Sequence, residues 1–206
     1  MDRKRALVIH HRACHLRQLA AHPELHVRNR PARASHNTDD AGSPSPDPAM
    51  HHFQLIALPP TPFAPLFTLS DQALAQHGAQ RHIATENTGY PCRISLEDAQ
   101  QGDELLLLPY EHQPAASPYR ASGPIYVRRG AVQRVLPPDE VPPYLSSRLL
   151  SVRAYDAAHQ IVDASVREGT QVAEEIERFF SNAEVAYLHL HFAKRGCFAC
   201  RVDRAS

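Results

Sequence analysis

The clearest alternation of apolar and polar residues runs along residues 187–202, near the end of the chain. Side chains alternate between the two faces of a β-strand, so one face of the first half collects Leu188, Leu190 and Phe192. The tripeptide Lys-Arg-Gly at 194–196 is suited to a three-residue hairpin loop, because its glycine supplies the positive φ that such loops need. The pattern therefore predicts an antiparallel hairpin.

One register of this hairpin satisfies the pattern of both strands. It sets Phe192 opposite Phe198, Leu190 opposite Cys200, and Leu188 opposite Val202. The other face of the hairpin then collects His189, His191, Cys197, Ala199 and Arg201. A slip by one residue would turn every side chain to the wrong face, so the sequence specifies this register strongly.

Shorter signals predict most of the remaining elements. Apolar runs bounded by turn residues favour strands at 53–58, 105–108 and 125–129, and a hairpin of two strands at 148–155 and 161–166. A helix is expected to begin after Ser70, a good N-cap, and to end at Gly78, which adopts the left-handed conformation easily. These elements indicate an α+β fold with a mixed, largely antiparallel sheet and about two helices packed on it.

The second helix is predicted from Thr170, as its N-cap, to about residue 182. Its core face is formed at helical spacing by Val172, Ile176 and Phe179 or Phe180. Glu174 and Arg178 are four residues apart, so they are expected to pair on the outer side of this helix.

Composition divides the chain into two parts. Residues 1–49 are rich in Arg and His, and residues 37–48 combine Pro, Ser, Asp and Gly. Such a segment cannot bury apolar surface, and its prolines prevent a continuous helix or strand ladder. We therefore predict a disordered N-terminal extension and linker over 1–49, a single α+β domain over 50–206, and Met50 as an alternative start of translation.

Charge and cysteine content exclude several classes of protein. The formal net charge is zero, which argues against a nucleic-acid binder because such proteins usually carry a basic face. No run of 18 apolar residues is present, so no membrane span is predicted. Four cysteines in 206 residues are too few to suggest a disulfide framework. We expect a soluble, cytoplasmic protein.

The spacing of Cys197 and Cys200 matches the C-x-x-C pattern of redox and zinc sites. In a strand, residues three apart point to opposite faces, so these thiols are not expected to bridge or to share a metal. His189, His191 and Cys197, joined by Cys92 from elsewhere, are zinc ligands in type and number. Because His-x-His is also common on strands without metal, no metal is expected, and zinc stays an open alternative.

Two segments, 88–93 and 109–128, combine residues that fix the backbone with residues that recognise polar groups. Arginine binds carboxylate or phosphate through two parallel hydrogen bonds, and tyrosine offers an apolar wall with a polar tip. The expected ligand-binding residues are Tyr90, Arg93, Tyr119, Arg120, Ser122 and Arg201. The alternative is that these side chains only hold loops against the domain.

At these residues the chain resembles an uncharacterised bacterial family, the domain of unknown function numbered 1203. The resemblance rests on Gly-Tyr-Pro-Cys-Arg at 89–93, Leu-Leu-Leu-Leu-Pro-Tyr-Glu at 105–111, Pro-Tyr-Arg-Ala-Ser-Gly-Pro-Ile-Tyr-Val-Arg at 118–128, and Gly-Cys-Phe-Ala-Cys-Arg-Val at 196–202. It extends from about residue 53 to 204 and implies no activity. Similar sequences often carry a second cysteine shortly after Cys-Arg, where this chain has Ile94 and Ser95. That departure weakens a metal site built on such a pair.

The leading hypothesis is a small ligand-binding or regulatory module that recognises an anionic group through its Arg/Tyr loops. One alternative is an enzyme that uses Cys92 as nucleophile or metal ligand, with a histidine as base. Another is a protein-interaction domain without a small-molecule site. No phosphate loop, dinucleotide fingerprint or H-E-x-x-H motif occurs, and Ser122 lacks the G-x-S-x-G environment of a hydrolase nucleophile. The sequence therefore assigns no reaction.

Overall fold

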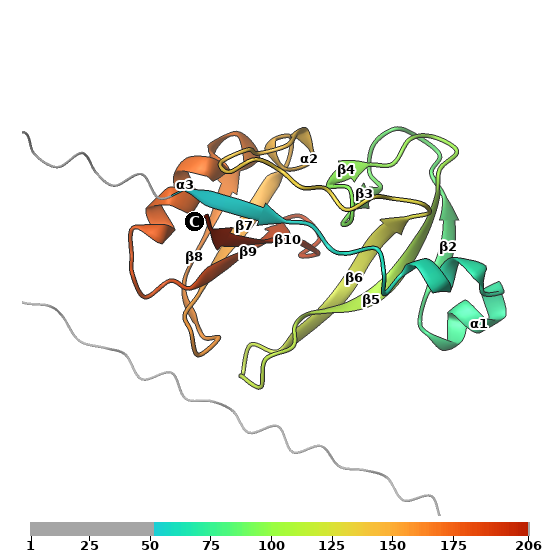
Figure 1. Ribbon diagram of the computed structural model, residues 1–206, viewed down its shortest axis with the longest axis horizontal. Helices are drawn as coiled ribbons and strands as arrows, with labels where there is room; N and C mark the ends of the chain where they lie inside the picture. The colour runs from blue at the N-terminus through green and yellow to red at the C-terminus, as the bar shows by residue number, and fades with distance from the viewer. Residues whose placement is uncertain (1–51, 206) are drawn as a thin grey trace, which may run out of the picture. The chain divides into compact units, whose positions relative to one another are not determined.

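The computed structural model describes residues 52–205 (Figure 1). The predicted extension over 1–49, and Met50 with it, lie outside the described residues. The α+β fold is confirmed, but the strands form two five-stranded sheets instead of one.

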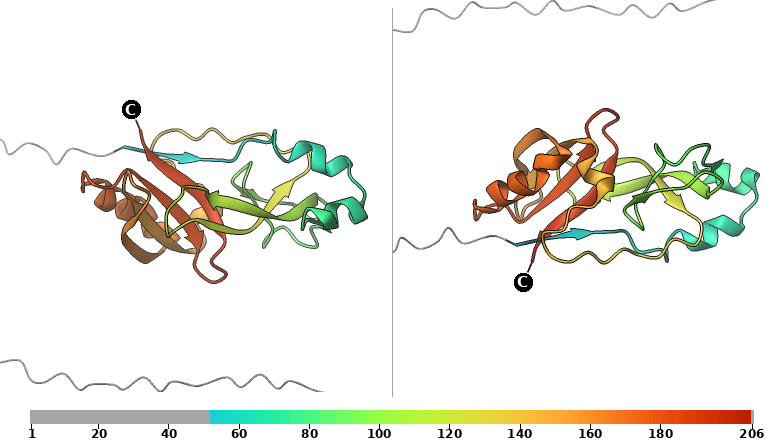
Figure 2. Two further views of the ribbon diagram at one scale, coloured as in Figure 1. Left: turned by 90° about the horizontal axis from the view of Figure 1, so that it is seen from below. Right: turned by 90° about the horizontal axis from the view of Figure 1, so that it is seen from above.

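The first sheet is antiparallel throughout and has the order β1-β10-β9-β7-β8. Its strands are β1 (Phe53–Ile56), β7 (Leu149–Tyr155), β8 (Ile161–Glu168), β9 (Tyr187–Phe192) and β10 (Phe198–Arg204). The strand at the start of the described chain thus lies beside the last one, as both views of Figure 2 show.

The second sheet is mixed and has the order β2-β5-β6-β3-β4. Its strands are β2 (Gln80–Ile83), β3 (Pro91–Cys92), β4 (Glu97–Asp98), β5 (Glu104–Gln113) and β6 (Ala121–Arg128). Only β3 and β6 pair in parallel, at Cys92 and Tyr126. The long hairpin of β5 and β6 forms the centre of this sheet.

Three α-helices and two short 3₁₀ segments complete the fold. They are α1 (Asp71–Gln76), α2 (Pro143–Ser146), α3 (Val172–Phe180), η1 (Ala64–Thr68) and η2 (Gly169–Gln171). Ser70 caps α1 as predicted, because its side chain accepts a hydrogen bond from the backbone N–H of Ala73 at 3.3 Å. Gly78 follows the helix with φ of +66°, the left-handed conformation expected of it.

The helix α3 differs from its prediction at its start and in its ion pair. Thr170 is not its N-cap, because residues 169–171 form η2 and α3 begins after Gln171. Arg178 pairs with Glu175, three residues earlier, instead of with Glu174. Glu175 is the residue that points inward, and only 4% of it is exposed.

The core face of α3 is confirmed, and it includes both phenylalanines: Val172, Ile176, Phe179 and Phe180 are all buried. These side chains belong to the larger hydrophobic cluster, which also contains residues of α2 and of all the central strands of the first sheet. A second cluster joins α1 to β5 and β6. In Figure 1, α3 lies against the first sheet and α1 lies beside β2.

The C-terminal hairpin has the predicted register over most of its length. Leu190 pairs with Cys200 and Leu188 with Val202. The predicted pairing of Phe192 with Phe198 is wrong, because a β-bulge between Phe198 and Cys200 sets Phe198 opposite His191. The bulge inserts one extra residue, so Ala199 joins the larger core and Phe198 turns to the histidine face.

Candidate functional site

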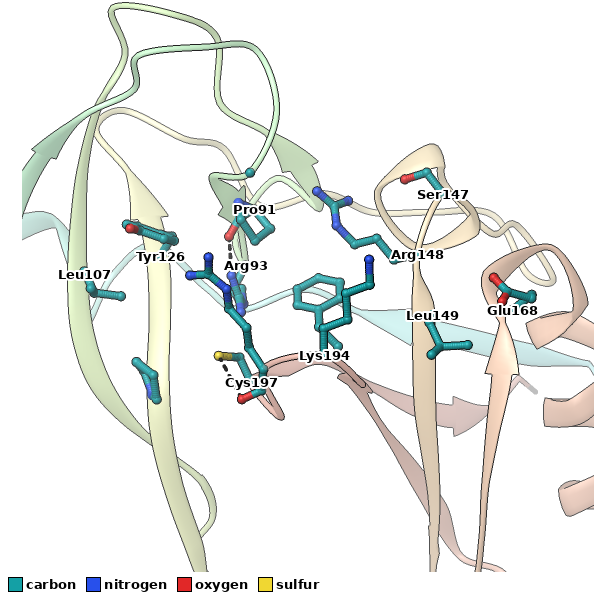
Figure 3. A pocket seen from close by; sticks show the side chains of 14 residues that line it. Pro91, Arg93, Leu107, Tyr126, Ser147, Arg148, Leu149, Glu168, Lys194 and Cys197 are labelled. Carbon is teal, nitrogen blue, oxygen red and sulfur yellow. Dashed lines mark hydrogen bonds between the residues drawn. The ribbon is translucent and has the colours of Figure 1, made fainter.

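A cleft of about 710 Å³ opens between the two sheets (Figure 3). One wall comes from β3, β5 and β6, and the other comes from the start of β7, the end of β8 and the loop between β9 and β10. The cleft is lined by Gly89, Pro91, Arg93, Leu107, Pro124, Tyr126, Ser147, Arg148, Leu149, Glu168, Phe192, Lys194, Arg195 and Cys197. Its volume lies within the range of small-molecule sites.

The charged side chains that line the cleft are mostly cationic. The lining contains three arginines and one lysine but only one carboxylate, that of Glu168. Such an excess of one sign in a concave site concentrates field lines and attracts ions of the other sign. The charge of the cleft therefore favours an anion.

Two backbone carbonyl groups hold Arg93 in the wall of the cleft. Only 2% of this residue is exposed. Its Nε donates a hydrogen bond to the carbonyl oxygen of Phe198 at 2.8 Å, and its Nη1 donates another to the carbonyl oxygen of Pro91. The guanidinium carbon also lies over the ring of Phe192, 5.1 Å from its centroid. These contacts fix the position of the guanidinium group.

Arg148 is fixed by a two-point ion pair that links the sheets. Its Nη2 donates to both carboxylate oxygens of Asp98 on β4, at 2.7 and 2.6 Å. Its Nη1 donates to the carbonyl oxygen of Tyr144 at 2.5 Å. The guanidinium carbon lies 5.2 Å from the centroid of the Phe192 ring. The ring of Phe192 therefore packs against two guanidinium groups, one from each side of the cleft.

Of the four cations that line the cleft, Lys194 and Arg195 are the two without a side-chain partner among residues 52–205. Within residues 52–205, neither side chain makes a hydrogen bond or an ion pair. Both stand on the loop between β9 and β10, which Gly196 closes with φ of +72°. In Figure 3 the side chain of Lys194 extends into the space between Arg93 and Arg148.

Tyr126 and Cys197 complete the polar lining near this loop. Burial raises the pKa of Tyr126, and the charges of Arg195 and Arg93 act in the opposite direction. Cys197 is half-buried, with its Sγ 3.8 Å from the carbonyl oxygen of Arg195. Cys92 and Cys200 are buried, so Cys197 is the cysteine of residues 52–205 that lines the cleft.

The residues predicted to bind a ligand lie in several places. Arg93 lines the cleft, and Tyr90 packs edge-on against Tyr126 with ring centroids 5.6 Å apart. Tyr119 and Arg120 are exposed at the β5–β6 loop, where Arg120 pairs with Glu111 at 2.6 Å.

The two remaining predicted residues also lie outside the cleft. Ser122 stands on β6, and it borders a shallow hollow beside Pro109. Arg201 lies over the ring of Tyr187, on the face of β10 that lines another cavity.

Sequence reasoning missed Arg148, Lys194 and Arg195 as site residues. The available signal is the pair of adjacent cations in a hairpin loop, a pattern that by itself indicates only the turn. Arg148 gave no separate signal, because a charged residue at the start of a strand is ordinary.

Cys92, the candidate nucleophile, is fully buried in β3, with 0% exposure. Its Sγ accepts a hydrogen bond from the backbone N–H of Arg128 at 3.4 Å. A nucleophile must reach its substrate, and this sulfur is enclosed by the second hydrophobic cluster.

The candidate zinc ligands do not form a metal centre in residues 52–205, where no group of three His, Cys, Asp or Glu side chains could hold a metal ion. His189 and His191 are 2% and 1% exposed. Burial lowers the pKa of each to about 3, so both are neutral at physiological pH. Cys197 lies on the cleft side, apart from them.

Among the described residues, no helix is long and apolar enough to cross a membrane. No curated protein matches the chain, and no solved structure does. The chain does match the family described as a protein of unknown function (DUF1203), over residues 89–204. This segment includes β3 to β10 and every residue that lines the cleft. The protein therefore belongs to the DUF1203 family.

Proposed function

We propose that the protein is a small-molecule binding module, and that the cleft between the two sheets takes an anionic group of its ligand. The observation that carries this proposal is the pair Lys194 and Arg195, two cations that face the cleft without a partner among residues 52–205. Phosphate and carboxylate are the anionic groups that such side chains bind.

Pre-organisation of the cleft supports the same proposal. Arg93 and Arg148 are already held by hydrogen bonds before any ligand arrives. Ordering a long side chain on binding costs about 0.5–1.5 kcal/mol, and that cost is confined here to Lys194 and Arg195. The ring of Phe192 offers apolar surface next to the charges, so the ligand's anionic group would adjoin an apolar or planar portion.

Thermal unfolding in the presence of phosphate, pyrophosphate, citrate and succinate tests the proposal. At least one of these anions should raise the melting temperature, because a ligand that binds only the native state stabilises it by mass action. The double variant Lys194→Gln/Arg195→Gln should lose that protection. Arg120→Gln is the matched control, since it removes one exposed cation outside the cleft.

The two arms of this experiment separate the cleft from the loop residues that the sequence suggested. Protection that survives in the Lys194→Gln/Arg195→Gln variant but disappears in Arg120→Gln would contradict the proposal and return the site to the β5–β6 loop. Absence of protection by every anion, in wild-type protein that unfolds reversibly, would also contradict it.

Chemical labelling gives a second readout at the cleft itself. The chain contains two lysines, Lys4 and Lys194. A protective anion should slow acylation of Lys194 by an amine reagent, measured by peptide mass spectrometry, while Lys4 serves as the internal reference. Equal slowing at both lysines would show an effect on the reagent and not on the site.

A further inference from the structure

A second cavity, of about 440 Å³, lies on the histidine face of β9. We call it the histidine pocket, and its ring-bearing walls are Tyr110 and His112 of β5, His159 of the β7–β8 loop, Tyr187 and His189 of β9, and Phe198 of β10. The rings of His112 and Phe198 are stacked, with centroids 5.2 Å apart. Aromatic walls of this kind suit a planar ligand.

Unpartnered imidazole nitrogens point to an occupant that forms hydrogen bonds. His189 is 2% exposed, and its Nδ1 is buried without a hydrogen-bond partner. Both ring nitrogens of His112 are buried without a partner as well. Buried polar groups are nearly always hydrogen-bonded, and both histidines belong to the lining of this cavity, so a ligand or an ordered water that moves these rings slightly could supply the missing partners.

The histidine pocket has one cationic side chain in its lining. Among the residues that line it, Arg201 is the only arginine or lysine, and none is a carboxylate. The Nε of Arg201 donates to Asp203 at 2.7 Å, which leaves its two Nη groups without a partner in residues 52–205. A guanidinium with free Nη groups can bind a carboxylate.

The hydroxyl group of Tyr187, whose ring packs against Arg201, already has partners within the protein. The hydroxyl oxygen of Tyr187 accepts a hydrogen bond from Gln113 Nε2 at 2.7 Å and lies 2.9 Å from Nδ1 of His159. These hydrogen bonds fix the side chain of Tyr187 without a ligand. The groups without a hydrogen-bond partner among residues 52–205 are therefore the Nη groups of Arg201, Nδ1 of His189 and both ring nitrogens of His112.

We infer that the histidine pocket binds a planar aromatic carboxylic acid, with its ring among the side chains of Tyr110, His112 and Phe198 and its carboxylate on Arg201. An imidazole N–H of His189 donates a further hydrogen bond to this ligand. The site is separate from the cleft and does not depend on the function proposed for it.

The test compares an acid with its uncharged amide on the same ring. Binding of 2-naphthoate and 2-naphthamide is measured by calorimetry on the wild-type chain, with benzoate and benzamide as the smaller pair. The acids should bind roughly tenfold or more tightly than the amides, because a hydrogen bond to a charged group is worth more than one to a neutral group. Equal binding of acid and amide would overturn the assignment to a carboxylate.

Variants locate the binding. Arg201→Gln should weaken acid binding by roughly tenfold or more and leave the amide unchanged, whereas Arg120→Gln, an exposed position outside both cavities, should change neither. The side chain of Arg201 is 42% exposed, so its replacement leaves the fold intact. Loss of acid binding in Arg195→Gln alone would assign the acid to the cleft and overturn the inference. Lack of detectable binding of either acid at 10 mM would overturn it as well.

A spectroscopic readout reports on the imidazoles directly. Bound 2-naphthoate should shift the ring resonances of His189 and His112 in NMR spectra, while those of exposed His77 stay in place. Shifts confined to residues of the cleft would contradict the inference.

Discussion

Acidification from pH 7.5 to 5.0 is expected to destabilise the fold because of His189 and His191. These residues are almost fully buried in β9, and burial is the main reason why the pKa of each is lowered to about 3. The positive charge of Arg153 on β7 acts in the same direction, as does His112 on β5 once it is protonated, and burial lowers the pKa of His112 as well. Arg201 on β10 adds to this effect at His189.

The sign of the effect follows from where the protons bind. An unfolded histidine takes up a proton near pH 6.5, whereas these two stay neutral in the native state until about pH 3. Their contribution to stability is therefore complete above pH 6.5 and is lost as the pH falls from 6.5 toward 3. At about 1.36 kcal/mol per pH unit, each costs about 2 kcal/mol between pH 7.5 and 5.0.

Between pH 7.5 and 5.0 the two histidines together lower the free energy of unfolding by about 4 kcal/mol. The total for a typical domain is about 5–15 kcal/mol. Urea unfolding at a series of pH values measures this loss. The variant His189→Gln should show about half of it, and His77→Gln, at an exposed position, should show all of it. Titration of Glu175 does not contribute in this pH window. Its ion pairs lower its pKa to about 2, so its contribution to stability is lost only below pH 4.5.

A free energy of unfolding that stays constant from pH 7.5 to 5.0 would refute this reasoning. So would an undiminished loss in the double variant His189→Gln/His191→Gln, because the titrating groups would then lie elsewhere.

Three further predictions concern stability. Leu190→Ala should cost about 2–5 kcal/mol in urea unfolding, because Leu190 is 0% exposed, whereas Val162→Ala, on the exposed face of β8, should stay within about 0.5 kcal/mol. Gly169→Ala should cost about 3 kcal/mol by the same assay, since a Cβ there would overlap a backbone carbonyl oxygen of α2, while Gly123→Ala meets only ordinary contacts. Deleting residues 1–49 should leave the melting temperature within about a degree, and a larger drop in calorimetry would show that they contribute packing.

The local elements could be predicted wherever apolar periodicity was strong. The strand of Leu105–Leu108, the helix after Ser70 and the C-terminal hairpin all occur. The arrangement in two sheets could not, because strand pairing is non-local: β1 pairs with β10 at the far end of the chain. The strands β3 and β4 contain two residues each, too few for any periodicity to show.

The buried histidines illustrate a limit of alternation as a signal. The sequence placed His189 and His191 on the face opposite Leu188 and Leu190, which is correct, but it did not indicate that this face is buried. That face is covered by the second sheet, where His112 of β5 lies 5.0 Å from the ring of His191. A pattern within one segment indicates which side chains share a face. It does not indicate whether a distant segment packs against that face and buries it.

The bulge after Phe198 is the feature that relates the two proposed sites. One extra residue in β10 sends Ala199 into the larger core and turns Phe198 toward His112, where its ring lines the histidine pocket. The carbonyl oxygen of the same residue accepts the hydrogen bond that holds Arg93 in the cleft. Bulges re-aim side chains beside functional sites, and regular pairing would have turned this ring into the core. A single irregularity that strand periodicity cannot reveal thus helps to shape both cavities.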